Sequence, residues 1–302
     1  MNIQLGAKGI DWTDATWNPL TGCYHGCEYC YARRMAERFG SKNHPPCDDV
    51  VAIWRGKPLY VSRSFSPPFP WKFAPTFYPQ RLDEPRRRKK PTKIFVVSSG
   101  DLFGDWVPDN WIEEVIKVVH DCPQHTFQFL TQNPVRLIGY DWPDNCWVGA
   151  TATNGASMPD VLSALALVDA EVRFISLEPL LGEVDTLWPH LEWLIIGPQS
   201  GPGGGQPERI WVQKLIEEAR WHGIPVWLKG NLEWEKQIQE WPLVAGVKEA
   251  MGTHRHPRVP IVVRGAGGRR TVAVPHLESK SRCRQAPRRS GQCFGPAFDP
   301  SG

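Results

Sequence analysis

Residues 21–32 read TGCYHGCEYCYA and place three cysteines, Cys23, Cys27 and Cys30, in a C-x3-C-x2-C spacing. The two glycines of this stretch let the backbone bend, so that three thiolates can converge on one point. Residues 31–39 (YARRMAERF) predict a helix that begins directly after the third cysteine. The partial positive charge at the start of a helix favours thiolates. The stretch therefore predicts a metal or cluster site built on one loop.

Three clustered thiolates suit two kinds of site. A closed structural zinc site needs four ligands, and His25 or the more distant Cys47 could supply the fourth. A [4Fe–4S] cluster normally takes four cysteines, so three would leave one iron open to bind another molecule. The other cysteines lack such spacing and are expected in the core or at the surface: Cys47, Cys122, Cys146, Cys283 and Cys293.

Outward from this loop, short apolar runs alternate with helical patterns. The apolar runs predict strands at 93–98, 125–131, 146–151, 172–177, 193–197 and 225–229. Helices are expected at 108–122, 158–168 and 208–222. Strands that alternate with helices predict βαβ units and a mostly parallel sheet. The fold class is therefore α/β, with a partial (β/α) barrel expected and a doubly wound open sheet as the alternative.

Composition divides the chain into a folded domain and a tail. We expect the (β/α) barrel domain to span residues 1–245, with an irregular insertion at 41–92 that is rich in proline and holds the run RRRKK. From residue 251 onward ten Lys and Arg stand against two acids, whereas the first 250 residues hold 25 bases and 30 acids. Residues 246–302 therefore predict a low-complexity basic Gly/Pro/Arg tail that is disordered, with a nucleic-acid-binding arm as the alternative.

The sequence also bears on the compartment. No stretch approaches 18 consecutive apolar residues, so we expect no transmembrane helix and no membrane partner. The N-terminal residues contain no apolar run typical of a secretory signal. Eight cysteines are too few for a disulfide scaffold at this length. These features together predict a cytoplasmic protein.

Ligands of such sheets bind at the carboxyl ends of the strands. At these ends the sequence places many hydroxyl and amide groups and few charges, which suits a polar organic ligand. The positions concerned are Ser98, Ser99, Gly100, Asp101, Thr131, Gln132, Thr151, Thr153, Asn154, Ser176, Glu178, Gln199, Ser200 and Lys229.

The cysteine motif, with Tyr29 as the aromatic residue before the third cysteine, resembles that of the radical S-adenosylmethionine (SAM) superfamily. The closer resemblance is to a phage- and prokaryote-associated family of unknown activity that is related to spore photoproduct lyase. It spans about residues 8–235. Seven blocks carry it, at 12–39, 94–108, 127–137, 147–154, 173–182, 195–203 and 225–232.

The resemblance implies that Cys23, Cys27 and Cys30 ligate three irons of a [4Fe–4S] cluster whose fourth iron binds SAM. An electron donor such as flavodoxin or ferredoxin would reduce the cluster. Reductive cleavage of SAM would then give methionine and a 5′-deoxyadenosyl radical, which abstracts hydrogen from a substrate. The substrate and the residues that contact its reacting atoms stay open, although the kinship with spore photoproduct lyase suggests nucleic acid.

The resemblance also implies a set of positions that contact SAM or the substrate. These are Tyr29 near the adenine, Ser99, Gly100 and Asp101 near the amino group, Thr151 and Thr153 near the ribose, and Glu178 and Gln199. Two of the sites depart from the relatives, which often carry Gly-Gly-Glu where this chain has residues 99–101 and 197–199. An amide at Gln199 weakens the expectation of an acid–base role there.

Two other functions are compatible with the residues. A zinc-binding module of Cys3His type, using His25, would be structural or would bind nucleic acid. An iron–sulfur protein without SAM chemistry would keep the cluster alone. For a nucleic-acid substrate, Arg33, Arg34 and the run 86–90 are candidates to contact phosphates.

Overall fold

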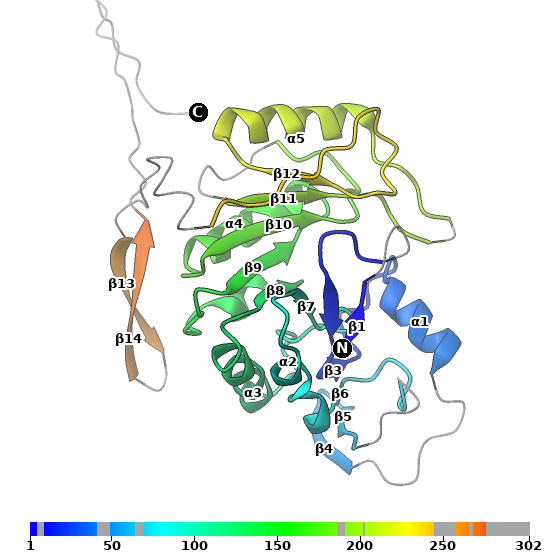
Figure 1. Ribbon diagram of the computed structural model, residues 1–302, viewed down its shortest axis with the longest axis vertical. Helices are drawn as coiled ribbons and strands as arrows, with labels where there is room; N and C mark the ends of the chain where they lie inside the picture. Colours follow the sequence, from blue (N-terminus) through cyan, green and yellow to red (C-terminus); the bar gives the residue numbers. More distant parts are fainter. Residues whose placement is uncertain are drawn as a thin grey trace, which may run out of the picture.

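The computed structural model describes residues 1–4, 9–40, 49–63, 69–185, 191–201, 203–244, 258–265 and 268–275. Its main element is an eight-stranded sheet with α-helices packed on it (Figure 1). Seven of the strands run parallel, and the first pairs with the second in antiparallel fashion. The mixed α/β fold with a mostly parallel sheet confirms the expected fold class at this level.

The strand order of the main sheet follows the order of the chain. It is β1 (Asn2–Ile3), β2 (Ala15–Trp17), β7 (Lys93–Val96), β8 (Thr126–Thr131), β9 (Cys146–Thr151), β10 (Val172–Leu177), β11 (Trp193–Ile196) and β12 (Val226–Leu228). Three helices connect successive strands, at α3 (Asp109–His120), α4 (Met158–Ala166) and α5 (Arg209–His222). Within the described residues, β1 and β12 are the two edges and the sheet does not close into a barrel.

Buried apolar side chains explain why these segments form strands and helices. Strands β9 and β11 are buried along their whole length, as expected for a sheet covered on both faces. Helix α3 buries six apolar side chains on one stripe, from Trp111 to Val119. Helix α5 ends at Gly223 in the left-handed conformation, the usual helix stop. None of the helices in the described part of the chain has the length and apolarity needed to cross a bilayer.

The segment expected to be an irregular insertion instead contributes three strands to a second small sheet, which β3 (Leu20–Thr21) completes. Its four strands are β3, β6 (Thr76–Phe77), β5 (Lys57–Val61) and β4 (Asp49–Trp54), followed by the short helices η2 (Pro79–Arg81) and α2 (Glu84–Arg87). Strands β4 and β5 form a hairpin whose turn, Arg55-Gly56, has positive φ at both residues. That turn geometry matches the twist of paired strands. Proline-rich flanks hid this hairpin from the sequence analysis.

The segment expected to be a disordered tail contains an antiparallel hairpin of β13 (Arg258–Gly265) and β14 (Gly268–Pro275). The two strands pair only with each other among the described strands. Residues 245–257 and 276–302 lie outside the described residues. The expected compositional boundary near residue 246 thus falls between β12 and this hairpin.

An aromatic layer fills the inner face of the main sheet. Alternate residues of a strand share a face, and here they place Phe95, Trp147, Phe174, Trp193 and Trp227 together in one buried cluster. Trp12 joins it, with its ring centroid 4.6 Å from that of Phe95. On the same face of the sheet, the residues two or four positions closer to the carboxyl ends of the strands include polar side chains. The aromatic layer is therefore the floor beneath any ligand bound at those ends.

Gly149 tests how tightly this floor is packed. A Cβ atom at Gly149 would lie 2.6 Å from the ring of Phe174. We therefore expect Gly149→Ala to lower the free energy of unfolding by about 1–3 kcal/mol through overpacking. Urea unfolding measures the change. The exposed Gly205 has open space around its Cβ position, so Gly205→Ala should be neutral or stabilise by about 0.4–1 kcal/mol. Equal stabilities for the two variants would contradict the tight packing.

Candidate functional site

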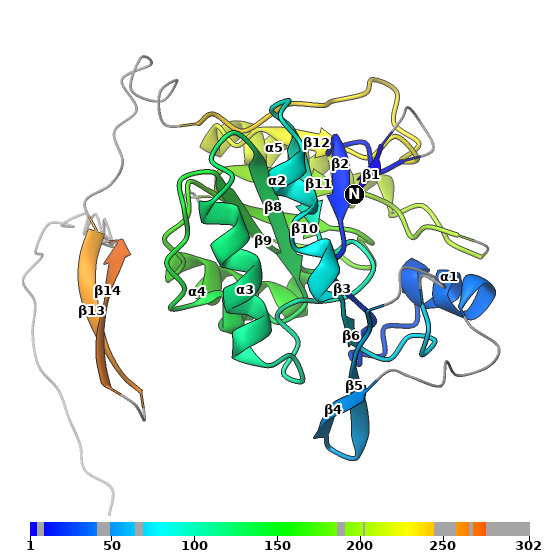
Figure 2. The ribbon, with the colours of Figure 1, turned by 60° about the horizontal axis from the view of Figure 1, so that its bottom comes forward.

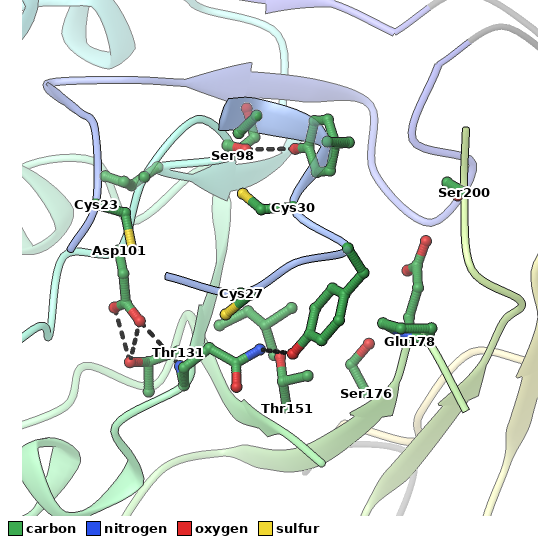
Figure 3. Close-up of a pocket in the computed structure, with 18 of the residues that line it drawn as sticks. Cys23, Cys27, Cys30, Ser98, Asp101, Thr131, Thr151, Ser176, Glu178 and Ser200 are labelled. Atoms are coloured by element: carbon green, nitrogen blue, oxygen red, sulfur yellow. Dashed lines mark hydrogen bonds between the residues drawn. The ribbon is translucent and has the colours of Figure 1, made fainter. Parts of the chain in front are cut away.

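A cavity lies at the carboxyl ends of the parallel strands, above the aromatic floor (Figure 3). Eight of the eleven residues predicted for the site line it: Cys23, Cys27, Tyr29, Cys30, Gly100, Asp101, Thr151 and Glu178. The other three serve nearby loops. Ser99 bonds Asn18 and the backbone of Gly22, Thr153 takes part in the turn before α4, and Gln199 contacts the backbone of Gly205. The structure therefore brings most of the predicted residues to one place.

The three cysteines come from the loop between β3 and α1 (Tyr31–Phe39). All three are free and half-buried. The sulfur of Cys23 accepts a hydrogen bond from the His25 amide, and the sulfur of Cys30 accepts one from the Arg33 amide at the start of α1, both at 3.4 Å. Burial raises the pKa of the Cys23 and Cys27 thiols. A metal that binds Cys23 and Cys27 would therefore have to displace more tightly held protons.

The donor set fits an iron–sulfur cluster. Ligands of one zinc ion stand within about 4 Å of each other, because each Zn–S bond is about 2.3 Å long. In a [4Fe–4S] cluster each cysteine binds a different iron, which spreads the sulfurs around the cluster. In the part of the chain that the structure describes, no three His, Cys, Asp or Glu side chains gather to hold a single ion. Three free thiols facing one cavity are the donors that a cluster with one open iron requires.

Close backbone contacts hold the cysteine loop against the end of β7. The amide of Gly22 donates to the carbonyl of Ser99, and the two glycines at 22 and 100 form an isolated parallel bridge. A Cβ at Gly100 would lie 2.7 Å from the Gly22 carbonyl oxygen, and one at Gly22 would lie 2.3 Å from the Ala74 carbonyl oxygen. Only glycine permits these approaches. The loop therefore sits where it does because two positions carry no side chain.

Asp101 ties the same loop to the sheet. It is 4% exposed, and its carboxylate accepts hydrogen bonds from the amides of Phe103 and Gln132 and from the hydroxyl of Thr131, at 2.7–2.9 Å. His25 Nε2 lies 2.9 Å from Oδ2 of the same carboxylate. Both oxygens are thus already engaged. The expectation that Asp101 contacts SAM stays a prediction, and a structural role that sequence reasoning missed stands beside it.

A charged cluster closes the other side of the cavity, where Glu178 lies opposite Cys23 and Asp101 (Figure 3). Lys229 follows β12 and is 8% exposed; its Nζ lies 3.1 Å from Asp11 Oδ1 and 3.6 Å from Glu178 Oε1. A Cβ at Gly197 would stand 2.7 Å from Lys229 Cγ, so the glycine leaves room for this side chain. Asp11 was not among the predicted residues, because nothing in its local sequence distinguishes it.

Two residues that line the cavity each have a buried polar side-chain atom without a hydrogen-bond partner among the described residues. These atoms are Nε1 of Trp12 and Oγ of Ser176. A buried polar group without a partner is rare in folded proteins. Near them, the Gln132 side-chain amide donates to the hydroxyl of Tyr29 at 3.1 Å. These two atoms are therefore unused hydrogen-bonding groups beside the cavity, and Trp12 was not among the residues predicted for the site.

Fold and site together define an α/β protein with three free cysteines that line a cavity at the carboxyl ends of a mostly parallel sheet. The chain belongs to DUF5131, a family of proteins of unknown function, whose model matches residues 7–287. The family pattern thus continues well past residue 235, where the sequence resemblance was expected to end. It includes the hairpin β13–β14.

No curated protein matches the chain. Among solved structures, a mutant of spore photoproduct lyase with bound AdoMet and dinucleoside spore photoproduct is similar, with 11% sequence identity and a TM-score of 0.38. The similarity covers 85% of this chain and 66% of the lyase chain. The chain therefore spans slightly less than two thirds of the length of that lyase.

Two glycines of the cysteine loop form a matched pair for testing how the loop is placed. Gly22 and Gly26 both have positive φ, but only Gly22 is crowded, whereas a Cβ at Gly26 would meet no atom within 4 Å. Each alanine substitution should carry a strain of about 1–2 kcal/mol. We expect Gly22→Ala alone to lose most of the iron bound on anaerobic reconstitution and to lower Tm further than Gly26→Ala. Equal iron contents in the two variants would show that contact with Ala74 does not position the loop.

Glu178 predicts a pH dependence of stability. Burial raises its pKa above the ordinary value of 4.5, with the charge of Lys229 opposing the shift. Because the folded state holds this proton more tightly than the unfolded state, protonation stabilises the fold at low pH. That stabilisation is lost as pH rises from about 4.5 through the raised pKa. Glu178→Gln should flatten this decline in urea unfolding between about pH 5 and pH 8. Parallel profiles for the two proteins would contradict the burial of an ionisable carboxyl.

Proposed function

We propose that the protein is a radical SAM enzyme, with a partial (β/α) barrel of that type, a [4Fe–4S] cluster and SAM as cofactor. The observation that carries the proposal is that Cys23, Cys27 and Cys30, free thiols of one loop, all line the cavity over the carboxyl ends of the strands. The reduced cluster supplies the electron that cleaves SAM to a 5′-deoxyadenosyl radical for hydrogen abstraction. Flavodoxin or ferredoxin is the expected class of electron donor.

In this proposal the side chains of the cavity bind and shield the cofactor. The three cysteines hold the cluster. Nε1 of Trp12 and Oγ of Ser176, which have no partner among the described residues, hydrogen-bond polar groups of SAM. Tyr29, oriented by its hydrogen bond from Gln132, borders the ligand. The aromatic floor keeps water from entering below, which radical chemistry requires of the protein.

The cluster at the far side of the cavity suits proton handling at the substrate. Lys229 lies between two carboxylates, and burial raises the pKa of Glu178 above its ordinary value. A group whose pKa is shifted toward neutrality exchanges protons readily. We therefore assign Glu178 to the substrate side of the cavity.

The zinc alternative uses His25 as the fourth ligand. In the structure its Nε2 is engaged by Asp101, and its ring packs edge-on against Trp106 at a centroid distance of 4.7 Å. This contact leaves Nδ1 as the ring nitrogen for a metal, and a carboxylate on the other nitrogen is the usual support of a metal-bound histidine. Metal content therefore has to distinguish the zinc module from the cluster. The other alternative, an iron–sulfur protein without SAM chemistry, differs from the proposal in SAM cleavage alone.

Substitution of single cysteines tests the proposal. After anaerobic reconstitution we expect about four irons and four sulfides per chain, and reductive formation of 5′-deoxyadenosine from SAM. Cys23→Ala, Cys27→Ala and Cys30→Ala should each abolish both, because each removes the ligand of one iron. Cys122→Ala and Cys146→Ala alter buried cysteines away from the cavity, and these matched controls should keep both. His25→Ala should retain iron.

Metal analysis and product assay separate the alternatives. About one zinc per chain, without iron, and its loss in His25→Ala would overturn the proposal in favour of the zinc module. A full cluster with no 5′-deoxyadenosine formed under strong reduction would leave an iron–sulfur protein without SAM chemistry.

A further inference from the structure

The part of the chain around the cysteines is basic, although the rest of the domain is acidic. Residues 23–80 contain eight Lys and Arg against four Asp and Glu, whereas the other residues up to 250 contain 17 against 26. This segment forms α1 and the small sheet. Figure 2 shows α1 and the β4–β5 hairpin on one side of the molecule, away from α3 and α4. Positive charge is therefore concentrated beside the cavity.

Three cationic side chains of this segment are exposed and form no ion pair with a described residue. Arg55, Lys57 and Lys72 have no carboxylate partner among the residues that the structure describes, whereas cations elsewhere, such as Arg136 and Arg220, are paired with acids. Two of the three lie over aromatic rings instead. The guanidinium of Arg55 lies 4.7 Å from the ring centre of Trp54, and Lys57 Nζ lies 5.1 Å from that of Tyr24.

The rings under these cations connect directly to the cysteine loop. Tyr24 immediately follows Cys23, and its ring stacks on Trp54 with an interplanar angle of 8° and a centroid distance of 6.1 Å. Its hydroxyl donates to the carbonyl of Pro58 on β5. A second stacked pair, Tyr60 and Trp71, has ring centroids 4.3 Å apart. Half-buried aromatic rings and unpaired cations thus alternate from the hairpin to the loop that lines the cavity.

We propose that this basic aromatic surface, defined by Tyr24, Trp54, Arg55, Lys57, Trp71 and Lys72, binds single-stranded nucleic acid. Free cations attract phosphates, and flat rings and guanidinium planes provide surfaces on which bases stack. An acidic protein would use the cations but not the rings. The inference rests on the proposed function in one respect: the bound strand would present a nucleotide to the cavity as the substrate.

The other basic run lies in the wrong place for this role. Arg86 is paired with Asp83 and Asp121, and the Arg88 side chain bonds Thr92, directly before the amino end of β7. The cavity lies at the opposite end of that strand. We therefore assign the phosphate contacts to the surface beside the cysteine loop and not to residues 86–90. The same run provides three exposed cations, Arg87, Lys89 and Lys90, as a charge-matched control.

Fluorescence anisotropy with labelled oligothymidylate and oligouridylate tests the surface on the reconstituted full chain. Affinity should fall log-linearly with salt between about 50 and 200 mM. The triple variant Arg55→Ala, Lys57→Ala, Lys72→Ala removes three phosphate contacts, so the slope of log K against log salt should become shallower by about 2. The control Arg87→Ala, Lys89→Ala, Lys90→Ala carries the same change of net charge and should leave the slope unaltered. An equal effect of the two triples would overturn the proposal.

Stacking is tested separately from charge. Trp54→Leu keeps every cation, and we expect it to weaken oligonucleotide binding by about tenfold at fixed salt. Poly-L-glutamate serves as the competitor that distinguishes an acidic protein partner. If it displaces the oligonucleotide at equal charge concentration and Trp54→Leu binds normally, the surface is a docking site for an acidic protein and the proposal fails.

The result can be read independently of the proposed function. The two triple variants alter exposed side chains outside the cofactor cavity, so they should cleave SAM at the rate of the unaltered protein. If a variant loses oligonucleotide binding but still cleaves SAM, the substituted surface binds the oligonucleotide and the cavity does not depend on it. Normal oligonucleotide binding by a chain that never forms 5′-deoxyadenosine would instead reject the enzymatic proposal and keep the surface. Absence of measurable oligonucleotide binding at low salt overturns the present inference.

Discussion

The carboxylate of Asp101 accepts hydrogen bonds from two backbone amides and one hydroxyl and contacts one imidazole, and these groups belong to three separate parts of the chain. Through His25 it holds the cysteine loop, and through Thr131 and Gln132 it holds the end of β8. Without the carboxylate, buried donors would lose their acceptor, at about 1–3 kcal/mol for each. The positions of the three thiols relative to the sheet therefore depend on this one side chain.

The chemistry of the cavity depends in turn on the packing below it. Trp12 belongs to the aromatic floor and also lines the cavity. The period of two along each strand produces this division, since Phe174 and Ser176 on β10, like Trp227 and Lys229, share one face at successive levels. The same strands thus provide a dry, rigid base and a polar rim. A substitution in the aromatic floor would therefore shift the polar groups of the cavity relative to the sheet.

The local patterns of the sequence were enough to predict six of the seven parallel strands, helices α3, α4 and α5, and the position of Cys23, Cys27 and Cys30 on one loop. Apolar runs and short spacings are local signals, because they involve residues that are close together in the sequence. The contact between His25 and Asp101 joins residues 76 positions apart, and no local pattern encodes such a pairing. The β4–β5 hairpin was missed for another reason, because the surrounding prolines resemble those of an irregular loop. The position of the run at 86–90 likewise depends on topology, which places it at the amino ends of the strands.

Consecutive residues of the cysteine loop contact different parts of the protein. The thiol of Cys23 faces the cavity, the ring of Tyr24 packs on the hairpin, and the imidazole of His25 turns to Asp101. A backbone so short cannot move one of these groups without moving the others. A ligand that stacks against Trp54 and Tyr24 would therefore act on the geometry of the thiols through a single loop. The basic surface and the three thiols are thus joined through one short loop.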